Sequence, residues 1–141
     1  LNLHGNLRTS DHSYQVRENQ VRGAEEGINI LSISDSVNVD ARDNVISDCD
    51  RGYDMTNITT DEETNISGGS VVDCDVGIIA FSDNNAFEEA RYGNNVERVT
   101  IENIDFSNNI THDLRAYGSD VTIKYRGSDD DVSEADGATV R

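Results

Sequence analysis

Several residue classes are scarce in this chain, and each scarcity argues against a class of protein. Only 11 of the 141 residues are Lys or Arg, and only Lys124 is a lysine. A nucleic-acid partner is therefore not expected, because phosphate binding needs clustered positive charge. No apolar run approaches the about 18 residues of a membrane-spanning helix, so no membrane span is expected in this segment. Hydrophobic residues make up 35%, which predicts a narrow, repetitive core rather than a thick one.

The ends of the chain favour a segment of something longer. The chain begins at Leu1 rather than Met, and residues 127–141 read as a polar acidic tail or as the start of a following segment. No signal peptide is visible, although a trimmed or mature chain would not show one.

The acidic residues outnumber the basic ones by a wide margin. Asp and Glu number 28, giving a net charge of -17. Such a composition is typical of disordered acidic chains, but β-branched residues alternate here in an ordered way. At about 1 M salt the Debye length falls to roughly 3 Å, so crowded carboxylates stop repelling one another. Abundant acids with almost no lysine resemble proteins of extreme halophiles, above all archaeal ones.

A repeat of 25 residues runs through the chain. Three segments align without gaps, 14–30, 39–55 and 64–80, and they place Gly27, Gly52 and Gly77 at intervals of 25. Four other rows keep the same interval: Val16, Ala41 and Ile66; Val21, Ile46 and Val71; Ile28, Tyr53 and Ile78; and Ala24, Cys49 and Cys74. Each copy holds three short alternating stretches, which predict strands. One copy cannot bury its apolar row alone, so the copies are expected to stack.

Further copies flank these three. Residues 99–115 form a fourth, in which His112 takes the glycine position, 35 residues after Gly77, and the extra ten residues lie in 82–95. Val121 and Ile123 open a fifth. At the other end, Leu3 lies 25 residues before Ile28 and predicts the close of an earlier coil.

The repeat resembles that of the pectin-lyase-like superfamily. The matching pattern joins Val16 to Asn19 and Ala41 to Asn44, followed by the pairs Gly27-Ile28, Gly52-Tyr53 and Gly77-Ile78. The resemblance implies an all-β fold, a right-handed parallel β-helix (a β-solenoid), with about five coils of about 25 residues and three short sheets over residues 1–126. It also implies a ladder of turn asparagines at Asn19 and Asn44, which Gly69 and Ile104 interrupt. It does not specify a function, since the superfamily includes lyases, hydrolases, tailspikes, adhesins and binding modules.

Candidate catalytic residues follow from the groove position in enzymes of this superfamily, over the post-glycine sheet. The outward row there contains Asn29, Asp54 and Ile79, then Asp113 or Leu114, depending on the register. Asp50, Asp54 and Asp75 form a candidate pair or trio of carboxylates for glycosidic hydrolysis. In so acidic a chain, a solvated face is the alternative reading.

The string Thr111 to Arg115 is the densest functional-looking segment. His112 is a candidate acid or base, and Asp113 and Arg115 are candidate ligand-binding residues. The alternative is that His112 only fills a glycine position at a coil edge.

Several further sites are predicted from residue type. Asp48, Asp50, Asp73 and Asp75 are candidate ligands of Ca²⁺ or of monovalent cations, and no other cofactor is indicated. Cys49 and Cys74 lie in successive copies, where either a disulfide or a row of free thiols fits, and no neighbouring histidine pair suggests zinc. Three sequons mark Asn57, Asn65 and Asn109 as glycosylation candidates. The insertion 82–95 carries Phe87, Arg91 and Tyr92, which are candidates to contact a sugar or to form a lid.

Three functions remain open from the sequence. The first is a structural and carbohydrate-binding β-solenoid module, extracellular, at the cell surface or in a viral fibre or spike, whose partner is a carbohydrate or cell-surface polymer. The second is a polysaccharide lyase or glycoside hydrolase, and the third is an intracellular filament-forming β-helix. A trimer or a larger assembly is the oligomeric alternative to a monomer.

Overall fold

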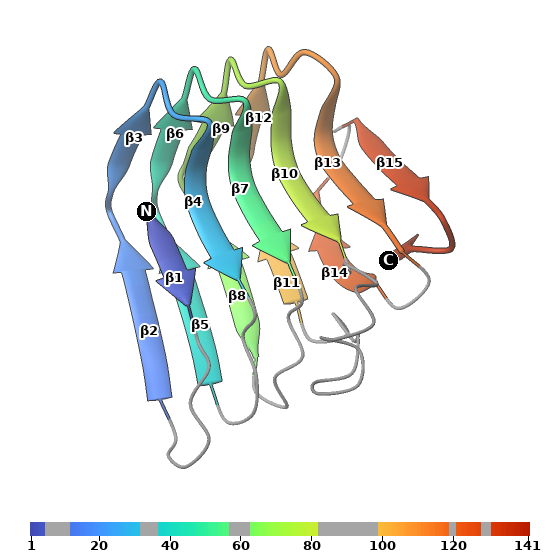
Figure 1. The fold of residues 1–141 in the computed structure, drawn as a ribbon, viewed down its shortest axis with the longest axis horizontal. Coiled ribbons are helices and arrows are strands. Elements are labelled where there is room, and N and C mark those ends of the chain that lie inside the picture. The colour runs from blue at the N-terminus through green and yellow to red at the C-terminus, as the bar shows by residue number, and fades with distance from the viewer. Residues whose placement is uncertain (5–11, 32–36, 57–62, 82–98, 119–120, 128–130) are drawn as a thin grey trace.

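The chain folds into parallel β-sheets. The computed structural model describes residues 1–4, 12–31, 37–56, 63–81, 99–118, 121–127 and 131–141. In this described part every regular element is a strand and every strand pair is parallel (Figure 1). None of it forms a helix long and apolar enough to cross a membrane.

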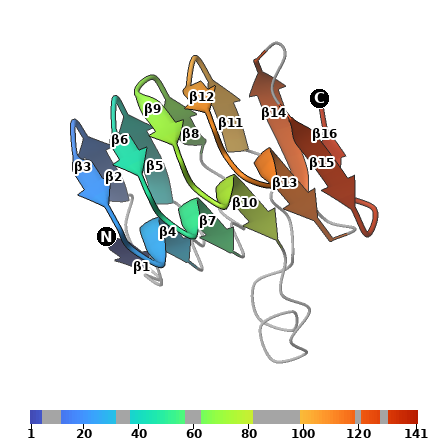
Figure 2. The ribbon, with the colours of Figure 1, turned by 90° about the horizontal axis from the view of Figure 1, so that it is seen from above.

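Three sheets account for all of these strands. Sheet A consists, in spatial order, of β1 (Asn2–His4), β4 (Glu26–Leu31), β7 (Arg51–Thr56), β10 (Val76–Phe81), β13 (His112–Tyr117) and β15 (Val132–Ala135). Sheet B consists of β2 (His12–Arg17), β5 (Val37–Arg42), β8 (Thr64–Ser67), β11 (Val99–Glu102), β14 (Thr122–Arg126) and β16 (Thr139–Val140). Sheet C consists of β3 (Gln20–Arg22), β6 (Val45–Ser47), β9 (Ser70–Val72) and β12 (Asp105–Ser107). The chain passes from sheet B to C to A and returns, as Figures 1 and 2 show, an arrangement consistent with a β-solenoid.

The predicted 25-residue register is confirmed for the first three copies. Val16 pairs with Ala41 and Ala41 with Ile66 in sheet B. The same interval pairs Val21, Ile46 and Val71 in sheet C, and Ile28, Tyr53 and Ile78 in sheet A. Nearly all of these side chains are fully buried, with Val21 partly buried, so equivalent apolar residues of successive copies pack on one another in a single core.

The two short turns of each copy contain a residue in the left-handed region. Between sheets B and C it is Glu18, Asp43, Gly68 or Asn103, and between sheets C and A it is Gly23, Asp48, Asp73 or Asn108, with φ between 53° and 67°. Gly, Asn and Asp tolerate this conformation better than most residues. Turn residue types are therefore set by backbone conformation as much as by chemistry.

Asn44 is the polar residue at the centre of the turn between sheets B and C. Its side chain is 1% exposed, and its Oδ1 accepts hydrogen bonds from the backbone N and the Nδ2 of Asn19, at 3.1 and 3.0 Å. Its Nδ2 donates to the carbonyl oxygen of Val16 at 2.9 Å and to the hydroxyl of Tyr53 at 3.1 Å. The expected stacking of Asn19 on Asn44 is thus present, and Gly69 ends it.

The glycine row has a steric cause. A Cβ atom on Gly52 would lie 2.4 Å from the carbonyl oxygen of Gly77 and 2.4 Å from Cγ1 of Val71. A Cβ on Gly27 would lie 2.6 Å from the oxygen of Gly52. At these glycines the backbone of the next copy approaches too closely for any side chain.

Two predicted alignments are wrong. Val76 pairs with His112 and Ile78 with Leu114, so Asp113, not His112, takes the glycine position. The turn after β12 is one residue longer than in the earlier copies, which shifts sheet A from an offset of 35 to one of 36. At the N-terminus, Leu3 pairs with Ile30 rather than with Ile28.

Residues 127–141 contain two strands that the sequence did not indicate. β15 pairs with β13, and β16 pairs with β14. The segment that reads as a polar tail therefore extends sheets A and B.

Candidate functional site

The outer face of sheet A carries most of the candidate residues. Ile28, Tyr53, Ile78 and Leu114 point into the core, at 0–1% exposure. Because side chains alternate along a strand, the outward residues are those between them. The outward row that follows is Asn29, Asp54, Ile79 and Arg115, which pair in this order. Neither Asp113 nor Leu114 completes this row, because the one-residue shift places Arg115 there.

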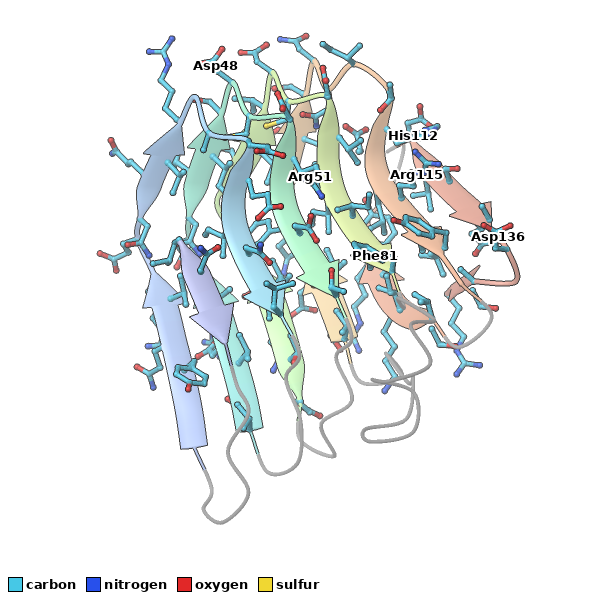
Figure 3. The ribbon with its side chains drawn as sticks, viewed as in Figure 1. Asp48, Arg51, Phe81, His112, Arg115 and Asp136 are labelled. Carbon is cyan, nitrogen blue, oxygen red and sulfur yellow. The ribbon has the colours of Figure 1, made fainter. Side chains whose placement is uncertain are left out.

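Arg51 organises a polar cluster on this face. Its guanidinium lies 3.0 Å from Oε1 of Glu26 and 3.5 Å from Oε1 of Glu25, and it also donates to Oδ2 of Asp54. Figure 3 shows Arg51 on the same face as Phe81, His112 and Arg115. One cation therefore bridges the acids of two successive copies.

Asp54 is the candidate catalytic residue with the most perturbed surroundings. Its side chain is 3% exposed, and its Oδ1 accepts a hydrogen bond from Thr56 Oγ1 at 3.1 Å. Burial raises the pKa of Asp54 above its ordinary value, although Arg51 and Thr56 act in the opposite direction. A buried acid with a raised pKa can hold a proton nearer neutrality, as a general acid must.

The other two carboxylates of the predicted trio do not join Asp54. Asp50 and Asp75 are exposed residues of the turns between sheets C and A, and no hydrogen bond or ion pair within the described residues links either one to Asp54. Their backbone amides bond to the carbonyls of Ala24 and Cys49 in the preceding copies. The solvated alternative fits Asp50 and Asp75.

Two aromatic rings stack on the outer face of sheet A. Phe81 and Tyr117 have ring centroids 5.0 Å apart and planes 6° apart, and the Arg115 guanidinium lies 5.5 Å from the Tyr117 centroid. All three are partly or fully accessible. Two accessible aromatic rings and a cation are thus grouped on this part of the face.

His112 and Asp113 have separate structural surroundings. The Nδ1 of His112 is buried and lies 3.3 Å from Oδ1 of Asp131, without hydrogen-bond geometry. Asp113 accepts hydrogen bonds from Nδ2 of Asn109 at 2.8 Å and from the backbone N of Asp131 at 2.9 Å. Asp113 therefore holds the residue that precedes β15, and no hydrogen bond or ion pair within the described part of the chain joins it to Arg115.

Asn29 contributes an unsatisfied polar atom to the same face. Its Nδ2 donates to Oε2 of Glu26, whereas its buried Oδ1 has no hydrogen-bond partner among the described residues. Its neighbour across the strands is Asp54.

The predicted metal cluster is not formed. Among the described residues, no group of three His, Cys, Asp or Glu side chains is placed to hold a metal ion. The candidates Asp48, Asp50, Asp73 and Asp75 are all among the residues described. Asp48 and Asp73 instead occupy the left-handed turn position, with φ of 53° and 55°. Turn conformation explains why aspartate recurs there.

Cys49 and Cys74 are free thiols, so of the two alternatives the structure has the row of small buried side chains. Each sulfur donates to a carbonyl two residues earlier, at 3.3 Å to Ser47 and 3.4 Å to Val72. Burial raises the pKa of Cys74 to about 11, so its thiolate is scarce at neutral pH.

The sequons differ in their surroundings. The Asn109 amide is fully engaged: Oδ1 accepts from Cys74 N at 3.1 Å, and Nδ2 donates to Val71 O at 3.1 Å as well as to Asp113. Asn65 points outward from sheet B and is half-buried. Asn57, and with it Phe87, Arg91 and Tyr92 of the insertion, lies outside the described residues.

Sequence reasoning missed four residues of this face: Arg51 and Thr56, which hold Asp54, and the ring pair Phe81 and Tyr117. The rings lie 36 residues apart, the interval that Ile78 and Leu114 share. Aligning the apolar row instead of the glycine row would have revealed the pair.

Comparison of this chain with protein-family models, with curated proteins and with solved structures gives no match.

Proposed function

We propose that this chain is a segment of right-handed parallel β-helix, with about five coils, from a salt-adapted extracellular, cell-surface or virion protein. Its role is structural, and it binds carbohydrate along the outer face of sheet A. The pectin-lyase-like repeat supports the handedness, and the in-register pairing of equivalent residues supports a stiff stack.

The stacked Phe81 and Tyr117 rings with Arg115 carry the binding part of the proposal. Aromatic side chains on an outer face provide apolar surface for a sugar ring, and neighbouring charged groups bond its hydroxyls. Arg115 on β13 and the polar cluster around Arg51 on β7 supply such groups, on the two strands that flank β10.

A titration with neutral and acidic polysaccharides, at constant high salt, tests this proposal. Tyr117→Ala is expected to weaken binding of the polysaccharide that the unaltered chain recognises, because one ring of the pair is lost. Val45→Ala, which alters an exposed side chain on sheet C, is the matched control. Equal binding by both variants would remove sheet A from the proposal.

The acidic composition supports adaptation to salt, and unfolding experiments test it. The free energy of unfolding is expected to rise as KCl increases from about 0.1 M to 1 M, since the Debye length falls from about 10 Å to 3 Å. A stability that is flat or falls over this range would contradict the proposal.

A polysaccharide lyase or glycoside hydrolase is the second candidate, and the surroundings of Asp54 favour it. A buried carboxyl with a raised pKa beside Arg51 suits an acid or base role. Reducing ends, or an unsaturated sugar product, would be released by the unaltered chain and not by Asp54→Asn. Binding without any release by the unaltered chain would leave the structural and binding role alone.

A further inference from the structure

The outer face of sheet B concentrates the chain's scarce positive charge. The pairing of β2, β5, β8, β11 and β14 places outward side chains in two neighbouring columns: Gln15, Asp40, Asn65, Thr100 and Lys124; and Arg17, Arg42, Ser67, Glu102 and Arg126. These columns hold four of the chain's 11 basic residues and only two carboxylates. In a chain with a net charge of -17, the outer columns of sheet B are thus locally positive.

A groove follows these columns. Its volume is about 380 Å³, and its lining includes the cations Arg42, Lys124 and Arg126 together with Asn65 and Thr100. From Arg42 to Arg126 the second column crosses three strand spacings, about 14 Å at about 4.8 Å each. A short oligosaccharide is of that length, whereas a single inorganic anion is much smaller.

The cations of the groove are neutralised to different degrees. Arg17 and Arg42 both donate to Asp40, which is 7% exposed; burial alone would raise the pKa of Asp40, but the two guanidinium groups hold it below its ordinary value. Arg126 lies 3.2 Å from Oε2 of Glu102. Among the described residues no carboxylate lies within ion-pair distance of Lys124.

The remaining lining selects the class of anion. Glu63 and Glu102 also face the groove. A polymer with a charge on every unit at close spacing, such as a nucleic acid, would meet these carboxylates. A sugar chain offers hydroxyls to them and to Asn65 and Thr100, while one acidic group reaches Lys124.

We propose that this groove on sheet B binds an acidic saccharide, whose carboxylate or sulfate group pairs with Lys124 and whose hydroxyls bond to the amide, hydroxyl and carboxylate groups around it. The groove lies on a different sheet from Phe81 and Tyr117, so it is a second site that does not depend on the sheet A face.

Calorimetric titration of the whole chain, produced without glycosylation, tests the proposal with four probes. Tetragalacturonate and a sulfated cellotetraose carry the two acidic groups, the methyl ester of tetragalacturonate is the neutral control, and a single-stranded oligodeoxynucleotide is the competing class. At least one acidic sugar is expected to bind about tenfold more tightly than the methyl ester, because a hydrogen bond to a charged group is lost with the ester.

Three variants locate the site. Lys124→Gln is expected to weaken binding of the acidic sugar about tenfold, whereas Arg22→Gln, the same charge change on an exposed residue at the end of β3 in sheet C, changes it less than about twofold. Binding that Tyr117→Ala weakens and Lys124→Gln does not belongs to the sheet A face, so the two sites are read separately. Circular dichroism confirms that each variant is folded.

Three results would overturn the assignment. The first is that tetragalacturonate, the sulfated sugar and the ester bind with equal affinity, or that none of them binds. The second is that Lys124→Gln and Arg22→Gln change the affinity equally. The third is that the oligodeoxynucleotide binds more tightly than the acidic sugars and that Lys124→Gln abolishes its binding.

Discussion

Gly52→Ala tests whether successive copies contact one another as closely as the structure has them. The added methyl group would lie 2.4 Å from the carbonyl oxygen of Gly77 and 2.4 Å from Cγ1 of Val71. Carbon atoms normally keep about 3.5 Å or more from such neighbours. Since one neighbour is the backbone of the adjacent copy, the strain cannot be relieved by turning a side chain.

The expected cost is large for a protein of this size. Overpacking a filled core costs roughly 1–3 kcal/mol. Because Gly52→Ala would also displace the backbone of a hydrogen-bonded sheet, we expect a cost at the upper end of this range, about 3 kcal/mol. Domains are commonly stable by only about 5–15 kcal/mol. The substitution should therefore remove a substantial share of the free energy of unfolding.

Urea unfolding at constant KCl, followed by circular dichroism, measures the difference. Gly23→Ala is the matched control, because nothing lies within 4 Å of its Cβ position and its φ of 67° adds only backbone strain, about 1–2 kcal/mol. A loss for Gly52→Ala no greater than for Gly23→Ala would refute the close stacking of the glycine row.

Four further predictions follow from buried polar groups and thiols. Asn44→Ala should lower the free energy of unfolding by roughly 2–4 kcal/mol in urea, because it leaves several buried hydrogen-bonding groups without a partner. A loss under about 1 kcal/mol would contradict the hydrogen bonds assigned to Asn44. Because the pKa of Asp54 is raised in the folded state, its proton contributes most to the free energy of unfolding below the ordinary value of 3.8, and this contribution is lost as pH rises through the folded pKa. Asp54→Asn should therefore flatten the decline of the free energy of unfolding with pH. An unchanged pH profile would argue against the raised pKa. Cys74, with a pKa of about 11, should resist iodoacetamide at neutral pH until the chain is unfolded; rapid labelling of the folded chain would show otherwise. Asn109 should carry no glycan in a glycosylating host, because its Nδ2 is already bonded twice; a glycopeptide at Asn109 in mass spectrometry would disprove this.

The core could be predicted from the sequence because it repeats. Ile46 and Val71 fill equivalent positions in neighbouring copies, so the same apolar type is required every 25 residues. Hydrophobic burial depends on the position within the copy and not on its neighbours in sequence. For the first three copies, periodicity alone therefore predicts the strands, their parallel pairing and the inward rows.

The register of the fourth copy could not be read from the glycine row. The turn that contains Asn109 has one residue more than its equivalents, and its side-chain hydrogen bonds to Val71 and Cys74 hold it against the preceding copy. A one-residue shift exchanges the two faces of a strand. It moved Arg115 onto the outer row, where the sequence predicted Asp113 or Leu114.

The aspartates predicted to bind a metal ion, which form no cluster within the described residues, recur for a conformational reason. Asp48 and Asp73 recur because their turn requires a left-handed backbone, which aspartate tolerates. In a chain with 28 acids, recurrence of aspartate carries little information about cation binding. Backbone conformation had to be known before the two causes could be separated.

Outward columns follow different rules from inward ones, and this difference separates sites from scaffold. Inward, an apolar or aromatic side chain fills the equivalent position of every copy, as Ile28, Tyr53 and Ile78 do. Outward, each position is free to differ, so Lys124 pairs with Thr100 and Arg115 with Ile79 across adjacent strands. A repeat search detects only positions that agree between copies, and it therefore does not detect either proposed site. On a stacked scaffold, binding residues are best sought where an outward column departs from its neighbours in charge or in aromatic character.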